Sequence, residues 1–215
     1  MNLSALDHLP GAHLPGILTQ AECADIIALW DKPESLGSVQ ASPHNGLSGG
    51  YRLFASPLPP LYTKLHERFV GPVTALVDRW AALLADDIEY AAQHIERTVR
   101  RTQRGGPTAL LSAYNVGDTT PLHQDPVNSY PLLVSILLTA PGRDFTGGEF
   151  VLTETRPDMP EKPVPLVVPL QQGDAVVFPV RERVAQGPGG PQRVPVYQGM
   201  SRLLSGKRLM TAMFV

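Results

Sequence analysis

The second half of the sequence is a series of short strand-like runs, each shorter than an ordinary helix. Eight such runs follow one another between residues 108 and 215, and turn-forming Gly, Pro, Asp and Asn residues separate them. Short runs at this spacing are typical of antiparallel strands, so this half predicts a double-sheet jelly roll or a closely related barrel. The runs read "TALLSAYN", "TPLHQD", "PLLVSILLTA", "GEFVLTE", "PLVVPL", "DAVVFPV", "RVPVYQGM" and "RLMTAMFV".

The first half has the rhythm of helices. Residues 19–30 carry apolar side chains at helical spacing, and Thr19 followed by Glu22 has the pattern of a capping box that opens the helix. Residues 61–85 keep the same rhythm, but Gly71-Pro72 interrupts it, which predicts either two helices or one kinked helix. Residues 88–103 predict a further helix.

Helices that precede strands predict an α+β fold, a jelly roll with N-terminal helices packed against one sheet. At 215 residues the chain is expected to form one integrated domain. Residues 1–107 would be a helical and loop support region, and residues 108–215 would be the core. Within the support region, residues 31–50 predict a loop with one short strand, and residues 51–60 predict a strand that runs into a proline-bounded turn.

Composition limits the partners of the chain. A net charge of −2 and a pI near 6.3 give no electrostatic footprint for nucleic acid or an anionic membrane, although they leave a nucleic-acid substrate open. The N-terminal segment lacks the basic and apolar parts of a secretion signal, and no apolar run approaches the ~20 residues of a membrane span. Cys23, the single cysteine, cannot form an internal disulfide and is expected to pack against the core. We therefore expect a cytoplasmic protein without a membrane partner, whose oligomeric state the sequence leaves open.

The segment "LHQD" holds a candidate metal site. On a strand, residues two apart point to the same side, so the side chains of His123 and Asp125 are expected on the same face. An imidazole and a carboxylate are two of the three ligands of the 2-His-1-carboxylate site that binds iron(II). A His-x-Asp pair alone is more often a polar pair at a surface or turn. The missing ligand is a second histidine, and no histidine follows His123 in this chain.

Several separated motifs resemble one enzyme family in the same order. The segments are "LHQD", "ILLTAPGRDFTGGEFVLTETRP", "QGDAVVFPV" and "QGMSRLLSGKR". They resemble the iron(II)/2-oxoglutarate-dependent oxygenases of prolyl-hydroxylase type, in particular a bacterial family of oxygenases sometimes assigned to damaged DNA. The resemblance implies a double-stranded β-helix fold with iron(II) and 2-oxoglutarate as cofactors. It also implies hydroxylase-type oxidation, coupled to decarboxylation of 2-oxoglutarate to succinate. The substrate implied is a small molecule, an amino acid or a modified base or residue.

The last motif of that family reads His-Gly-x-Ser-Arg and then Ser-Gly-(Lys/Arg)-Arg. Here Gln198 stands in place of the histidine that is the third iron ligand, while Arg208 keeps the arginine that binds the distal carboxylate of 2-oxoglutarate. Tyr114 matches a family tyrosine that is a second partner for the cosubstrate, although a strand tyrosine is equally often a core residue. The resemblance thus implies a catalytic metal centre of His123, Asp125 and Gln198, with Arg208 and Tyr114 at the cosubstrate.

The glutamine at position 198 leaves the activity open. A neutral amide oxygen is a weaker donor for iron(II) than an imidazole nitrogen. Gln198 can ligate the metal, or water can take its position. The site can also be vestigial, or Gln198 can be an engineered substitution that disables it. Two functions follow from these alternatives. One is an iron(II)/2-oxoglutarate-dependent dioxygenase. The other is a catalytically silent or engineered-inactive jelly-roll protein that binds 2-oxoglutarate or another small ligand.

Three other histidines are candidates for a replacement ligand. His66 and His94 fall in predicted helices, where a polar face explains them. His44 falls in the loop-like stretch before residue 50, which can fold over the mouth of the barrel.

The remaining polar and glycine residues of the β half are given structural roles. Asp174 and Glu149 are expected to be structural, and Arg202 is expected to be a solvated arginine at a strand end. Gly147-Gly148 and Gly173 are expected to serve turns or a close approach of the backbone.

Overall fold

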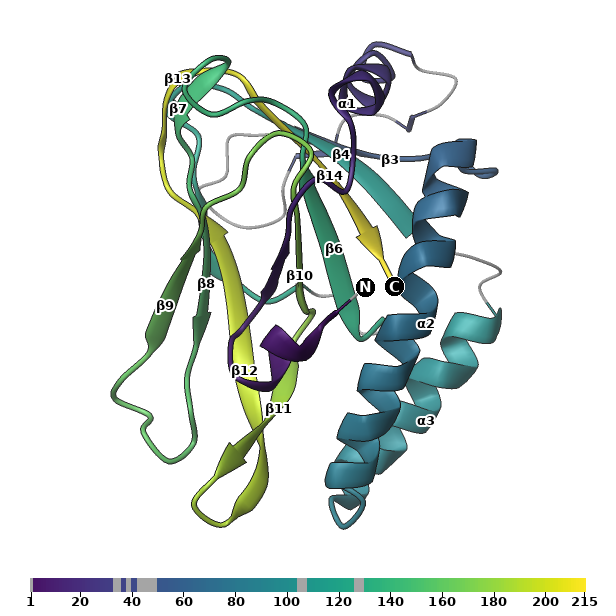
Figure 1. Cartoon of the computed structure of the whole chain (residues 1–215), viewed down its shortest axis with the longest axis vertical. Helices are drawn as coiled ribbons and strands as arrows, with labels where there is room; N and C mark the ends of the chain where they lie inside the picture. The colour runs from purple at the N-terminus through teal and green to yellow at the C-terminus, as the bar shows by residue number, and fades with distance from the viewer. Residues whose placement is uncertain (1, 33–35, 38–39, 42–49, 104–107, 126–129) are drawn as a thin grey trace.

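The computed structural model describes residues 2–32, 36–37, 40–41, 50–103, 108–125 and 130–215. His44 lies outside the described residues. The described parts form three layers, which Figure 1 shows from left to right as a smaller sheet, a larger sheet and two long helices. This arrangement confirms the α+β fold that the sequence predicts.

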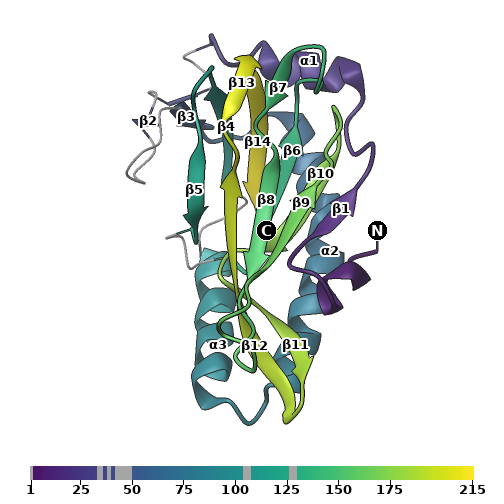
Figure 2. The same ribbon diagram turned by 90° about the vertical axis from the view of Figure 1, so that its left-hand side faces the viewer.

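Within the described ranges the larger sheet has seven strands, and every pair of neighbours in it is antiparallel. The smaller sheet has five strands, four in the order β11-β12-β8-β9 and a fifth, β5, which pairs with β12 (Figure 2). A third, two-stranded sheet joins β13 and β7. In order, the larger sheet contains β1 (Ala12–Leu14), β10 (Ala175–Pro179), β6 (Leu132–Leu137), β14 (Arg208–Phe214), β4 (Thr108–Tyr114), β3 (Gly50–Leu53) and β2 (Gln40–Ala41). The other strands are β5 (Thr120–His123), β7 (Phe145–Gly147), β8 (Phe150–Glu154), β9 (Val164–Val168), β11 (Glu182–Gly187), β12 (Gly190–Met200) and β13 (Leu203–Gly206).

All eight predicted runs contain a strand, but the prediction missed β7, β11 and β13 in this half. It also missed β1, which lies in the first half of the chain and pairs with β10. Strands β1, β2 and β3 come from the first 107 residues and share a sheet with strands of the second half. The boundary at residue 107 stays a prediction.

The helices cover the outer face of the larger sheet. Helix α2 (Pro60–Leu83) runs through Pro72 as a single helix, which decides between the two alternatives for residues 61–85. Helix α3 (Ile88–Gln103) lies beside it (Figure 1). Helix α1 (Gln20–Ile27) begins with the predicted capping box: the Glu22 amide donates to the Thr19 hydroxyl, and the Thr19 amide donates to the Glu22 carboxylate. Among the helices described, none is both long enough and apolar enough to cross a membrane.

Two apolar cores lie on the two faces of the larger sheet. One packs between this sheet and the helices, and the buried Cys23 belongs to it as expected. The other packs between the two large sheets. Strand β14 shows the division clearly, because Leu209 and Met213 belong to the first core, whereas Met210 and Ala212 belong to the second. By this alternation Arg208, at the start of β14, faces the space between the sheets.

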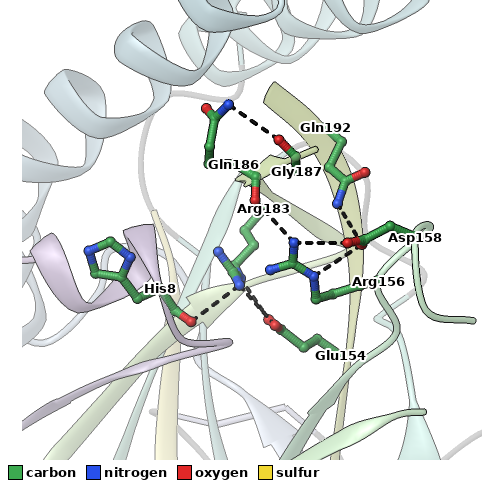
Figure 3. A network of polar contacts seen from close by, with 8 residues as sticks. All are labelled: His8, Glu154, Arg156, Asp158, Arg183, Gln186, Gly187 and Gln192. Atoms are coloured by element: carbon green, nitrogen blue, oxygen red, sulfur yellow. Dashed lines mark hydrogen bonds and ion pairs between the residues drawn. The ribbon is translucent and has the colours of Figure 1, made fainter. Parts of the chain in front are cut away.

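A buried ion pair ties the N-terminal 3-10 helix η1 (Ser4–Asp7) to the smaller sheet (Figure 3). Arg183 on β11 donates to both carboxylate oxygens of Glu154 on β8, at 2.7 and 2.8 Å. The same guanidinium donates to the carbonyl oxygens of Asp7 and His8 at 3.1 and 3.3 Å. Both side chains are almost fully buried, so the pair supplies the partners that each charge needs inside the protein.

Candidate active site

The candidate site is built on the pairing of β5 with β12. In this ladder Gln198 and His123 are directly opposite each other, and paired residues project their side chains on the same face of a sheet. Gln198 comes two residues after Val196, which belongs to the core between the sheets. His123 and Gln198 therefore both face the interior of the jelly roll.

Asp125 reaches the same place from just beyond the end of β5. The Nε2 atom of Gln198 donates to the Oδ2 atom of Asp125 at a distance of 3.1 Å. Gln198 thus lies opposite His123 and contacts Asp125, although 73 positions separate Asp125 from Gln198 in the sequence.

The orientation of the His123 ring is set by its own strand. Its Nδ1 atom lies 2.8 Å from the carbonyl oxygen of Pro121. Because a carbonyl oxygen only accepts hydrogen bonds, Nδ1 is the protonated nitrogen in the neutral ring. Nε2 then carries the lone pair, which is the tautomer that suits a metal-binding histidine.

No group of three or more His, Cys, Asp or Glu side chains placed to hold a metal ion occurs within the described ranges. The side chain that lies opposite His123 in the ladder and contacts Asp125 is the amide of Gln198. His66 and His94 do not replace it, because they lie on the helices α2 and α3 at the outer face of the larger sheet. The Nε2 atom of His94 lies 3.7 Å from a carboxylate oxygen of Asp78.

Arg208 is a buried cation between the two sheets. Its side chain is 2% exposed, and its Nε atom has no hydrogen-bond partner among the residues described. Arg208 pairs with Tyr114 across the β14–β4 ladder, and its guanidinium lies 5.9 Å from the centre of the Tyr114 ring and 5.8 Å from that of Phe145. Burial lowers the pKa of Arg208 to about 10, against the opposing effects of Tyr114 and Glu149. The group stays charged at neutral pH and suits an anionic ligand.

The glycine pair before Glu149 makes room for this arginine. Gly148 has a φ of +66°, and a Cβ atom on it would lie 3.0 Å from Cδ of Arg208 and 2.9 Å from Cδ1 of Leu203. The close approach that the sequence predicts for Gly147-Gly148 is thus confirmed, and its partners at Gly148 are the side chains of Leu203 and Arg208.

Glu149 and Asp174 both anchor turns. Glu149 accepts a hydrogen bond from the Ser201 hydroxyl, which lowers the pKa of the Glu149 carboxyl. The Asp174 carboxylate accepts hydrogen bonds from the Gly16 and Gln171 amides and lies 2.8 Å from Nε2 of His13. These contacts are structural, as expected, and Arg202 is exposed at its strand end.

Two residues near the site were missed by the sequence reasoning. Thr120 pairs with Met200, and its hydroxyl is buried without a hydrogen-bond partner in the described part of the chain. Gln124, between His123 and Asp125, donates from its side chain to the backbone carbonyl groups of Val196 on β12 and of Arg181 just before β11. Its position inside the His-x-Asp motif is the one sequence signal that could have drawn attention to it.

Comparisons with known proteins show the family and the fold of the chain. Residues 49–215 match the family Oxygenase-NA, described as "Oxygenase, catalysing oxidative methylation of damaged DNA". An uncharacterized protein of Mycobacterium tuberculosis, found in the strains CDC 1551 and H37Rv, is 30% identical over 161 residues, which are 73% of this chain and 68% of the relative.

Solved structures with a similar fold include a prolyl-4-hydroxylase of Pseudomonas putida, with a TM-score of 0.56 and 13% identity, covering 98% of this chain and 95% of that one. HygX of Streptomyces hygroscopicus, with nickel and 2-oxoglutarate bound, has a TM-score of 0.55 and 11% identity, with coverage of 97% and 83%. A viral collagen prolyl hydroxylase of Paramecium bursaria Chlorella virus-1, in complex with 2-oxoglutarate, has a TM-score of 0.53 and 11% identity, with coverage of 97% and 96%. At these identities the likeness concerns the fold.

Proposed function

The chain belongs to the Oxygenase-NA family of oxygenases, and we propose that it is an iron(II)- and 2-oxoglutarate-dependent dioxygenase. The observation that carries the proposal is the meeting of His123, Asp125 and Gln198 on the interior face of the jelly roll. The similar structures named above include proteins that bind 2-oxoglutarate, and this supports the choice of cosubstrate.

The three side chains fit iron(II), but we expect them to bind it less strongly than a complete 2-His-1-carboxylate site would. His123 offers the Nε2 lone pair, and Asp125 offers a carboxylate oxygen. Gln198 would bind through its amide oxygen, while its Nε2 atom keeps the hydrogen bond to Asp125 that orients the amide. Because an amide oxygen is a weaker donor than imidazole, we expect weaker iron binding than in a site with two histidines.

Arg208 fits the far carboxylate of 2-oxoglutarate. A guanidinium presents a planar fork of N–H donors that a carboxylate can accept as a pair. A buried arginine whose Nε atom has no partner in the described residues is costly to maintain, and an anionic ligand would offset that cost. The Tyr114 ring beside it would border the same ligand.

Bound iron(II) with 2-oxoglutarate and oxygen supplies oxidation of a substrate C–H bond, coupled to decarboxylation of 2-oxoglutarate to succinate. The protein's own residues hold and orient the reactants. The Pro121 carbonyl fixes the His123 tautomer, the Gln198 amide holds the Asp125 carboxylate, and apolar neighbours such as Val196 and Met200 limit the access of water.

The proposal also concerns the class of substrate. Because the family is described as acting on damaged DNA, we propose a modified base as the first class to test, followed by amino acids and small molecules. The experiment measures succinate release with iron(II), 2-oxoglutarate and oxygen. The panel contains oligonucleotides with alkylated bases, free amino acids and small metabolites, and His123→Ala serves as the inactive control. Substrate-dependent succinate release that is lost in the control supports the proposal.

One observation favours a silent ligand-binding protein instead. The amide of Gln198 takes the place of the second histidine of the resembled motif, and it already has a hydrogen-bond partner in Asp125. This alternative predicts that 2-oxoglutarate binds with an affinity that depends on Arg208, and that no member of the panel stimulates succinate release above the His123→Ala control.

A further inference from the structure

Two strands, β11 and β5, pair with successive parts of β12 along one of its edges. Strand β11 pairs with β12 as far as Pro195, and β5 begins to pair with it at Gln198. Val196 lies in the seam between these two ladders. Its N–H group donates to the carbonyl oxygen of Arg181, just before β11, at 2.8 Å. The carbonyl group of Val196 points to the same edge of the strand as its N–H group.

The side chain of Gln124 closes this seam. Its Nε2 atom donates to the carbonyl oxygen of Val196 at 3.1 Å and to that of Arg181 at 2.5 Å. An amide nitrogen carries two hydrogens, so both are used on main-chain carbonyls of two different segments. Gln124 thereby supplies the hydrogen bond that a continued β5–β12 ladder would have made.

We propose that Gln124 is a positioning residue that fixes the His123–Asp125 segment relative to Gln198, an inference that rests on the proposed function. Strand β5 ends at His123, so Asp125 lies beyond the ladder and is not placed by strand pairing. The Gln124 amide anchors the residue between the two proposed ligands to β12, two positions before Gln198. Side chains that orient metal ligands commonly affect metal affinity about 10–100-fold. The amide ligand at position 198 makes the placement of the other two ligands more important.

The test compares metal binding by three variants. Gln124→Met keeps the length of the side chain but removes both N–H donors, whereas Gln124→Lys keeps N–H donors. Gln192→Met is the matched control, because Gln192 on β12 is a glutamine whose side-chain amide donates to Asp158 at 2.9 Å, outside the site. Calorimetry with iron(II) under anaerobic conditions gives the affinity. The visible spectrum with cobalt(II) reports the ligand geometry, and the melting temperature of the metal-free protein reports folding.

We expect Gln124→Met to bind iron(II) about 10-fold or more weakly and to change the cobalt(II) spectrum, with a melting temperature close to that of Gln192→Met. Gln124→Lys should bind iron(II) more tightly than Gln124→Met. Wild-type affinity and spectrum in Gln124→Met would overturn the inference and leave the proposed function intact. If Gln124→Met fails to fold, Gln124→Ala, which also lacks both N–H donors, takes its place, and wild-type affinity and spectrum in that variant would overturn the inference. A wild-type chain that binds neither metal would overturn both proposals.

Discussion

The Nε2 atom of Gln198 donates a hydrogen bond of 3.1 Å to the Oδ2 atom of Asp125, a residue 73 positions earlier in the chain. The contact joins a residue within β12 to a residue just past the end of β5. We propose that this amide takes the place of the second imidazole of a 2-His-1-carboxylate site.

Replacing this amide by an imidazole should strengthen metal binding. We predict that Gln198→His binds iron(II) about 10–100-fold more tightly than the wild type, because a nitrogen donor replaces a neutral amide oxygen. Anaerobic calorimetry with iron(II) measures the difference. If the wild type binds no iron and Gln198→His does, the silent ligand-binding alternative is favoured over the dioxygenase.

Removing the buried charge of Arg208 should weaken 2-oxoglutarate binding without lowering the stability of the ligand-free protein. We predict that Arg208→Leu loses 2-oxoglutarate binding by about 100-fold or more, since truncating one partner of a buried charge pair costs about 2–5 kcal/mol. The free energy of unfolding without ligand should not fall, because the variant removes a buried charge whose Nε atom is unpartnered among the described residues. Exposed Arg202→Leu is the control. Unchanged 2-oxoglutarate affinity in Arg208→Leu would show that Arg208 does not bind the far carboxylate of 2-oxoglutarate.

A methyl group at Gly148 should disturb the same arginine. The Gly148→Ala variant would carry a Cβ atom 3.0 Å from Cδ of Arg208, on a backbone with a φ of +66°. The matched control is Gly142→Ala, which has a φ of +79° but no atom within 4 Å of the added Cβ. Both variants should lose about 1–2 kcal/mol of stability from the left-handed backbone, and Gly148→Ala alone should also weaken 2-oxoglutarate binding. Equal 2-oxoglutarate affinities in the two variants would contradict the packing argument.

The Asp174 carboxylate should make the fold sensitive to acid. Burial acts to raise its pKa, but hydrogen bonds from the Gly16 and Gln171 amides and from His13 bring the pKa below its ordinary value. A carboxyl group with a lowered pKa in the folded state stabilises the fold at neutral pH, and this contribution is lost as the pH falls through the folded-state pKa.

Asp174→Asn should therefore cost about 1–3 kcal/mol at pH 7, and the difference from the wild type should shrink as the solution is acidified below about pH 4. Denaturant unfolding across pH measures both effects, with exposed Asp31→Asn as the control. A difference that stays constant from pH 7 to pH 3 would assign the effect to packing instead of charge.

The periodicity of the sequence predicts most of the fold because apolar residues dominate the strands that face the two cores. The prediction missed β11, whose segment "ERVAQG" carries charged residues where a buried strand is expected to be apolar. Arg183 is nevertheless buried, because Glu154 on β8 and the carbonyl groups of the N-terminal segment surround it (Figure 3). A partner supplied by a distant segment is not visible in local periodicity.

The candidate site could be predicted only in part for a similar reason. Strand alternation places His123 and Asp125 together, but the register that sets Gln198 opposite His123 depends on the whole arrangement of the smaller sheet. The resemblance to a known motif, and not periodicity, drew attention to Gln198 and Arg208. Gln124 was overlooked because its role arises from the seam between two strands that are distant in sequence.

The most direct measurement is an anaerobic titration of the wild-type chain with iron(II) and 2-oxoglutarate, followed by visible absorption. If His123, Asp125 and Gln198 hold the metal while Arg208 holds the cosubstrate, a metal-to-ligand charge-transfer band should appear and saturate. The band should be absent in His123→Ala. No band in either the wild type or Gln198→His would contradict the assignment of these residues to an iron site.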